Sequence, residues 1–439
     1  METREAGRVT RRQFSVAALG CLGAASAMRA ASAEPAPGFD CRKDFAIFTR
    51  RHGRAPFVYL DSAATSQRPE VVIDAIGDFY REHNANPSAS SHSLARGANQ
   101  LYEDSRRSIA EFINAYESSE IIFTRGTTEA INLVASAWGL ANLKAGDEIL
   151  LTIAEHASNL LPWRLVARRH QAVIRFANVD ESGRIDVEDF RRKLSSRTRL
   201  ASFSHVSNVA GFVNPAAELC SLARAAGALA FVDAAQSAPH VPIDIRQMSC
   251  DFLAFSSHKM LGPMGVGVLF GRRELLDRLP AYQSGSNMAH DVDLEFETLE
   301  SGAKRFGAGT PNVCGAVGMA AAAGYLRKLR REGCIQHEKQ LVEYGLGRLT
   351  AIPELRLLGP QSPESRTPVF TFVIENHDVT DLVRALDDTG IAVRAGDLSA
   401  LPLLRHFGVT RALRASGHVY NSREDIDQLA EGLRYIVNQ

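Results

Sequence analysis

Beginning near Tyr59, the chain alternates short apolar runs with longer segments in which apolar residues recur at helical spacing. Each run has the length of a buried strand, and polar or glycine-rich residues follow most of them. Helices that alternate with strands in this way favour an α/β fold with a mainly parallel sheet. We predict strands at 148–153, 173–176, 200–204, 229–232, 251–255 and 265–270, and helices at 70–82, 94–114, 128–140, 160–170 and 215–226.

The pattern changes near Leu326 to long helices with fewer strands, at 368–374 and 391–393. A chain of 439 residues with 45% hydrophobic content has enough apolar side chains for two cores. A second, smaller lobe explains the change. The predicted parts are a segment at 34–58 that packs against the small domain, a large domain at 59–325, and a small α+β domain at 326–439.

The N-terminus differs from the rest of the chain. It carries the run RRQF at residues 11–14, a short stretch of apolar and small residues at 16–27, and ASA at residues 31–33. Together these features predict a twin-arginine signal peptide over residues 1–33, and therefore passage through the twin-arginine translocase to the periplasm. The apolar stretch is too short to remain as a membrane-spanning helix, so no stable membrane insertion is expected.

Composition narrows the kind of ligand. The 50 basic and 50 acidic residues cancel, and no block of like charge follows the N-terminus, so neither a nucleic-acid nor a membrane-surface footprint is present. A small-molecule ligand is expected. The five cysteines beyond residue 33 show no close-paired spacing, which argues against a zinc site and against a disulfide framework.

The most informative segment is SSHKMLGP at residues 256–263, directly after the predicted strand 251–255. Ligands of parallel sheets bind at the carboxyl ends of strands, and a tight turn there could direct the Lys259 amine inward. A Schiff base with an aldehyde cofactor requires such a lysine. Taken alone, a lysine at a strand end is more often a solvated charge. The neighbouring motifs therefore decide the interpretation.

Asp233 ends a second predicted strand, 229–232. A buried carboxylate is costly unless it meets a positive partner. The protonated pyridine nitrogen of pyridoxal 5'-phosphate (PLP) is such a partner. The alternative is an aspartate that caps a helix, which is common after strands.

Two further motifs follow strand-like segments. Thr127 and Thr128 precede an apolar helix, where backbone amides and hydroxyls would suit a phosphate, although a simple threonine cap is the alternative. His156 follows the predicted strand 148–153, where its ring could stack on a planar cofactor or serve only a structural role.

These motifs, in this order, resemble the class V aminotransferase superfamily, and specifically its branch of cysteine desulfurases and selenocysteine lyases. The resemblance covers essentially the whole chain after the signal peptide. The segments that carry it are YLDSAA at 59–64, TTE at 127–129, EH at 155–156, HVSN at 205–208, DAAQ at 233–236, SSHK at 256–259, GTPN at 309–312 and RAS at 414–416.

The resemblance implies a PLP-dependent homodimer of fold type I, with a seven-stranded, mainly parallel sheet and active sites at the subunit interface. Lys259 would be the Schiff-base lysine, His156 the residue stacked on the ring, and Asp233 the partner of the pyridine nitrogen. The other implied cofactor contacts are Gln236 on the ring oxygen, and Thr127, Thr128, Ser256 and His258 on the phosphate, joined by Thr310 of the partner subunit.

On the substrate side, the resemblance assigns the carboxylate to Arg414, with Asn208 beside it and Arg394 in the Arg-x-Gly element. A guanidinium binds a carboxylate bidentately, which gives this role a physical basis.

The branch carries its sulfur-accepting cysteine shortly after Arg-x-Gly, whereas this chain has Ser399 there. A hydroxyl is a poor sulfur acceptor, so a persulfide mechanism is not expected, with Cys314 as the alternative thiol.

Other substrate-side positions also depart from the family. Ser88-Ala89 stands where a His-Arg pair is usual, and Gly307 replaces an acidic residue, while the cofactor positions are retained. We therefore predict a periplasmic PLP enzyme that acts on the amino group of an amino acid or an amino-acid-derived natural product, for example in siderophore or peptide tailoring. Lys259 would transfer the proton at the α-carbon. The alternatives are a cysteine desulfurase or carbon–sulfur lyase that releases sulfide or selenide directly, and a noncatalytic binding protein that keeps the fold.

Overall fold

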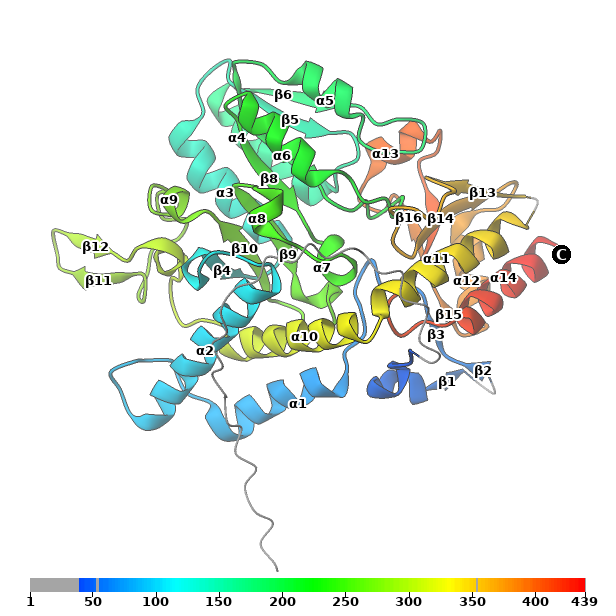
Figure 1. Ribbon diagram of the computed structural model, residues 1–439, viewed down its shortest axis with the longest axis horizontal. Coiled ribbons are helices and arrows are strands. Elements are labelled where there is room, and N and C mark those ends of the chain that lie inside the picture. The colour runs from blue at the N-terminus through cyan, green and yellow to red at the C-terminus, as the bar shows by residue number, and fades with distance from the viewer. Residues whose placement is uncertain (1–38, 53–54, 353, 439) are drawn as a thin grey trace, which may run out of the picture. The chain divides into compact units, whose positions relative to one another are not determined.

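The computed structural model describes residues 39–52, 55–352 and 354–438 (Figure 1). The predicted signal peptide lies outside these residues and stays a prediction. Within them, no helix is both long enough and apolar enough to cross a membrane.

The large sheet has seven strands in the order β4-β10-β9-β8-β7-β5-β6. The pairs from β9 through β6 are parallel, and β10 runs antiparallel to both β4 and β9. The prediction of a seven-stranded, mainly parallel sheet is confirmed. The strands are β4 Ile121–Thr124, β5 Glu148–Thr152, β6 Val173–Ala177, β7 Thr198–Ser204, β8 Leu229–Asp233, β9 Phe252–Ser256 and β10 Gly267–Gly271.

Both faces of this sheet are covered, which explains why its central strands read as continuous apolar runs. In β9, Phe252 and Ala254 belong to one hydrophobic core, while Leu253 and Phe255 belong to the other. Alternate side chains point to opposite faces of a strand, so each face needs its own apolar layer. The helices up to residue 331 are α1 Glu70–Asp78, α2 Ser93–Phe112, α3 Thr127–Asn142, α4 Leu161–His170, α5 Val187–Lys193, α6 Ala216–Ala225, α7 Ser237–His240, α8 Ile245–Met248, α9 Arg273–Leu276 and α10 Val313–Arg331.

A smaller sheet lies near the C-terminus, in the order β13-β14-β17-β16 with antiparallel pairing (Figure 1). Its residues share a core with side chains of α11, α12 and α14. These elements are β13 Leu355–Leu358, β14 Val369–Ile374, β16 Arg394–Gly396, β17 Ala412–Ser416, α11 Cys334–Thr350, α12 Val379–Asp387 and α14 Arg423–Val437. Helix α13, Leu401–His406, packs in a separate small core through Leu403 and Leu404.

The N-terminal segment reaches this C-terminal region. Arg42 donates to Asp425 over 2.7 Å, and β3 (Val58–Tyr59) pairs in parallel with β15 (Ile391–Ala392). The predicted boundary after residue 325 falls inside α10, and the domain limits stay predictions. The remaining short strands are β1 Arg51–His52 with β2 Ala55–Pro56, and β11 Ala289–Val292 with β12 Glu297–Leu299.

Differences from the pattern-based elements are local. The four-residue β4 is not among the predicted strands, because so short a run carries little periodic signal. The predicted helix 70–82 is divided, since α1 ends at Asp78 and continues as a π-helical segment, Phe79–His83. The predicted strand 391–393 is split between β15 and β16.

Candidate active site

A cavity of about 410 Å³ opens at the carboxyl ends of β7, β8 and β9. The structure brings twelve of the thirteen predicted site residues into its lining. The exception is Thr310, which is exposed and lies outside this lining. The assignment of Thr310 to a partner subunit stays a prediction. The twelve lining residues are Thr127, Thr128, His156, Asn208, Asp233, Gln236, Ser256, His258, Lys259, Arg394, Ser399 and Arg414.

Lys259 ends a short 3-10 turn, Ser257–Lys259, that follows β9 directly. The turn closes through Leu261, whose φ of 70° lies in the left-handed region. Burial lowers the pKa of the Lys259 amine to about 8, against the opposing effect of Asp233. With this pKa about a tenth of the amine is neutral at pH 7, far more than for a lysine in water, and the neutral form is the nucleophile toward an aldehyde.

Asp233 and Gln236 follow β8. Asp233 is buried, and its Oδ1 accepts a hydrogen bond from Ala235 N at 2.9 Å. Burial raises the pKa of Asp233, while this N–H and Lys259 act to lower it. The helix-cap alternative is not supported, since α7 begins after Gln236 and has no side-chain cap. Gln236 donates to Ala63 O at 2.7 Å, which leaves its Oε1 buried without a partner among the described residues.

The hydroxyls of Thr127, Thr128 and Ser256 gather at the N-terminus of the 16-residue helix α3. Ser256 Oγ accepts from Thr127 N at 2.8 Å and lies 2.7 Å from Thr127 Oγ1. Thr128 Oγ1 donates to Ser158 Oγ at 2.9 Å. The backbones approach closely here, because a Cβ on Gly267 would lie 2.5 Å from the Cα of Gly126. Hydroxyls and amides at a positive helix end suit a phosphate.

His156 follows β5 and comes directly after the buried Glu155. Its Nδ1 accepts from Ser158 N at 3.1 Å. Burial, with the charges of Lys259 and Arg414, lowers the pKa of His156 to about 4, so its ring is neutral at neutral pH. The preceding Glu155 accepts from Asn159 and Ser204 at 2.7 Å each, and burial raises the pKa of Glu155 to about 7.

The two arginines of the cavity share one carboxylate. Arg394 Nη2 lies 2.8 Å and Arg394 Nε 3.0 Å from the Asp61 oxygens, while Arg414 Nη2 lies 3.4 Å from Asp61 Oδ1. Arg414 also donates to Asn208 O at 3.1 Å. Its Nε is buried without a partner in the described part of the chain. Two guanidinium groups against one carboxylate leave an excess positive charge, which suits a substrate carboxylate.

Ser399 enters the cavity on a strained loop. Leu398 and Ser399 have φ values of 51° and 54°, and hold the loop by accepting from Asn208 Nδ2 and Ala157 N. No hydrogen bond to the Ser399 hydroxyl is found within the described ranges. Asp397, which the sequence analysis missed, also lines the cavity and caps Ser399 N at 3.0 Å.

None of the five cysteines in the described residues lines this cavity. Cys314 is half-buried, and its Sγ lies 2.8 Å from Tyr80 Oη. The other four are buried, as expected for packing residues. The described residues also hold no group of three or more histidine, cysteine or acidic side chains that could bind a metal ion.

The pattern of the family described as Aminotransferase class-V matches residues 58–429. The chain belongs to this family. The chain is 43% identical over 394 residues to a probable cysteine desulfurase of Halalkalibacterium halodurans, and the match covers 90% of this chain and 96% of that protein. It is 41% identical over 396 residues to a cysteine desulfurase of Pectobacterium atrosepticum, covering 90% and 97%.

Solved structures agree with this assignment. A cysteine desulfurase from Thermococcus onnurineus has a TM-score of 0.86 at 35% identity, covering 90% of this chain and 97% of that chain. One from Escherichia coli has a TM-score of 0.83 at 34% identity, with the same coverage. A more distant structure, 24% identical with a TM-score of 0.77, carries glycine covalently linked to its PLP cofactor. The fold is that of PLP-dependent enzymes of fold type I, and the chain is a PLP-dependent enzyme.

The cavity fits this cofactor on its own chemistry. The Lys259 amine, with its lowered pKa, offers a linkage point, and the buried Asp233 carboxylate offers a counter-ion for a ring nitrogen. Gln236 Oε1, which has no partner among the described residues, offers an acceptor for a ring hydroxyl. Thr127, Thr128, Ser256 and His258 would hold the phosphate, and His156 would cover the ring.

Proposed function

We propose that this enzyme acts in the periplasm on the amino group of an amino acid or an amino-acid-derived natural product, without an enzyme-bound persulfide. The observation that carries the proposal is the composition of the cavity. It combines the Lys259 amine with the Arg414 guanidinium, and its lining offers the Ser399 hydroxyl but no described thiol.

Bound PLP supplies an electron sink for negative charge at the carbon next to the amine. The protein supplies the proton transfer. With a pKa of about 8, the Lys259 amine is able both to take and to return a proton near neutral pH. The Asp233 carboxylate would stabilise a positive charge on the ring nitrogen of the cofactor. The His156 ring is neutral and adds no charge of its own.

Substrate orientation falls to the arginines. Arg414 is fixed by Asn208 O and Asp61, and its Nε, which has no partner among the described residues, makes it the better receptor for a substrate carboxylate. Arg394 is half-exposed and already bidentate to Asp61, so it has less capacity to spare. In a substrate that carries a carboxylate next to its amine, the carboxylate would bind Arg414 while the carbon that bears the amine lies near Lys259.

Export and assembly are further parts of the proposal. The arginine pair at residues 11–12, the short apolar stretch and the ASA site support a twin-arginine signal peptide. That route carries folded proteins, so the cofactor would be loaded before transit. The exposed Thr310 supports a homodimer in which one subunit completes the phosphate site of the other. Cell fractionation of the wild type and of a double Arg11→Lys, Arg12→Lys variant tests export, and the variant should stay in the cytoplasm.

The second candidate is a cysteine desulfurase or carbon–sulfur lyase that releases sulfide or selenide directly. It is favoured by the names of relatives that are 41–43% identical to this chain. Incubation of the purified enzyme with cysteine and with selenocysteine, followed by assays for sulfide, selenide and alanine, separates the two. Rapid production of alanine would overturn the first proposal. Consumption of amino groups from other amino acids, without release of sulfide from cysteine, would support it.

A further inference from the structure

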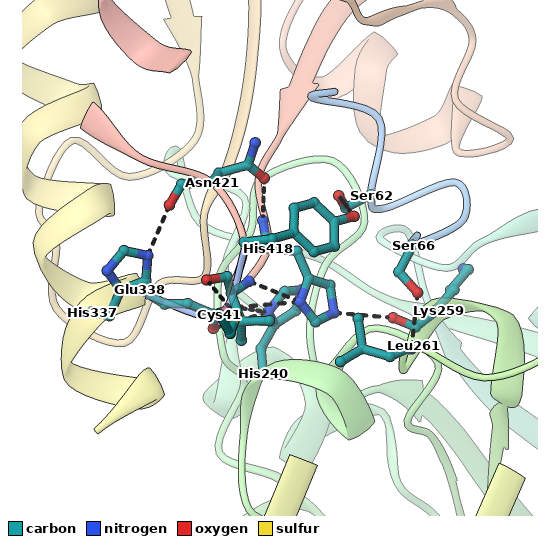
Figure 2. Close-up of polar contacts among 12 residues, drawn as sticks. Cys41, Ser62, Ser66, His240, Lys259, Leu261, His337, Glu338, His418 and Asn421 are labelled. Atoms are coloured by element: carbon teal, nitrogen blue, oxygen red, sulfur yellow. Dashed lines mark hydrogen bonds and ion pairs between the residues drawn. The ribbon is translucent and has the colours of Figure 1, made fainter. Parts of the chain in front are cut away.

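Next to the backbone of Lys259 lies a cluster of buried polar side chains (Figure 2). We call it the His–Glu–His cluster, and it consists of His240 at the end of α7, Glu338 on α11 and His418 in the loop after β17. None of these side chains lines the cavity around Lys259. Their proximity to the reactive lysine therefore needs a separate explanation.

The hydrogen bonds of His418 determine which of its ring nitrogens carries the proton. Val419 N donates to His418 Nδ1 at 2.8 Å, and a backbone N–H can only donate, so Nδ1 is unprotonated. Burial holds the pKa of His418 well below its usual value, so the ring carries a single proton. That proton is on Nε2, which lies 3.3 Å from the backbone oxygen of Lys259 and therefore donates to it.

The rest of the cluster fixes the orientation of the His418 ring. The rings of His240 and His418 are 5.0 Å apart, and His240 Nδ1 lies 3.0 Å from both Glu338 oxygens. Tyr420 stacks on His418 with an interplanar angle of 15°. The backbone of His418 is tied to Asn421, whose Oδ1 accepts from His418 N at 2.8 Å. The His418 ring is therefore packed against the rings of His240 and Tyr420, and its backbone is fixed by Asn421.

Other contacts to the Lys259 turn come from Thr65 and Ser66, in the segment that follows β3. Ser66 N and Thr65 Oγ1 donate to His258 O at 2.9 and 3.0 Å. Ser66 Oγ accepts from Leu261 N at 2.9 Å (Figure 2). These bonds flank Lys259 without reaching its carbonyl. Across the described residues, His418 is the one donor that meets Lys259 O. The left-handed Leu261 adds strain that such contacts must offset.

We propose that His418 is a positioning residue for Lys259: by binding the lysine's own carbonyl, it keeps the turn in the conformation that presents the amine to the cofactor. This inference rests on the proposed role of Lys259 as the linkage lysine. It also connects the C-terminal sheet, which supplies Arg414, to the lysine at the end of β9. Substrate binding and amine orientation would then depend on one continuous segment, β17 and the loop 417–421 that follows it.

The test uses two amide variants of the holoenzyme. In His418→Gln, the side-chain Nε2 reaches about as far as the imidazole Nε2 and keeps the donor to Lys259 O. In His418→Asn, the side chain is shorter: its amide can still accept from Val419 N but does not reach Lys259 O. His337→Ala is the control, since it removes a neighbouring histidine that contacts Asn421 O at 2.8 Å and does not touch Lys259. For each protein we would measure visible circular dichroism of the bound cofactor, the rate of cofactor attachment to the apoenzyme, and thermal stability.

We expect the Gln and His337 variants to match the wild type in the dichroism and to attach cofactor within about twofold of its rate. The Asn variant should attach cofactor roughly three- to tenfold more slowly, as the loss of one buried hydrogen bond implies, and should show an altered dichroism signal.

If the Asn chain does not fold, His418→Leu fills the same space without a donor and should give the same result. Equal behaviour of the Gln variant and the donor-free variant would overturn the inference. Failure of the wild type to attach cofactor at all would instead overturn the role of Lys259.

Discussion

Replacement of Arg414 by glutamine should abolish the preference of the enzyme for amines that carry a carboxylate. Arg414 is buried, and its Nε has no partner among the described residues, so it is positioned to receive an anion. Asp61 would remain paired with Arg394, so the substitution leaves no buried carboxylate without a partner. The variant is therefore expected to fold.

The magnitude follows from the bonds that would be lost. A hydrogen bond to a charged group contributes about 1.5–3 kcal/mol, which corresponds to roughly a 10- to 150-fold change in affinity. L-alanine and 2-aminopropane are suitable probes, because they differ by a carboxylate in place of a methyl group. The assay is titration of the cofactor absorption band with each amine. The wild type should bind L-alanine more tightly than 2-aminopropane by about that factor, and Arg414→Gln should bind the two almost equally.

Arg394→Gln is the matched control for this experiment. Its side chain is half-exposed and bidentate to Asp61, so we expect a loss of only a few-fold in L-alanine affinity. If Arg414→Gln weakens the binding of both amines equally, Arg414 acts on the cofactor or on the fold. If it leaves the preference intact, the carboxylate binds elsewhere. Either result would refute this account of the substrate side.

Two further predictions concern Ser399 and His205. If Ser399 stands where the cysteine desulfurases carry their nucleophile, Ser399→Cys should form a persulfide on residue 399 when cysteine is added without other thiols, detectable by mass spectrometry, and should release sulfide when a thiol reductant is then added. Ser399→Ala should leave the activity on other amino acids unchanged. The absence of any persulfide on the cysteine variant would show that the loop does not bring this position to the substrate. Burial lowers the pKa of His205 from 6.5 to about 4, so the unfolded chain binds the proton more tightly and stability falls as the pH drops from about 6.5 to 4. This lowering corresponds to about 3 kcal/mol, and His205→Gln should flatten the dependence of the melting temperature on pH in that window; an unchanged slope would contradict the assignment.

The residues at the carboxyl ends of strands were predictable from the sequence. Lys259, Asp233 and His156 each follow an apolar run, and a parallel sheet brings such positions to one edge. The alternative for Asp233, a helix cap, could be decided only by the structure, which starts α7 four residues later.

Contacts between distant segments were not predictable in the same way. Asp61 lies 333 positions from Arg394, and its link to both arginines depends on how the N-terminal segment meets β16 and β17. Asp397 gives no periodic signal because it sits in an irregular loop beside the left-handed Leu398. The bond from His418 to Lys259, 159 positions apart, likewise depends on tertiary packing.

The central claim is that Lys259 forms the covalent link to PLP, opposite Asp233. Reduction of the purified enzyme with borohydride, followed by peptide mass spectrometry, tests it most directly. The account predicts a phosphopyridoxyl group on Lys259 in the wild type and none on any lysine of Lys259→Ala. A wild-type enzyme with the group on another lysine, or with no group on Lys259, would contradict it.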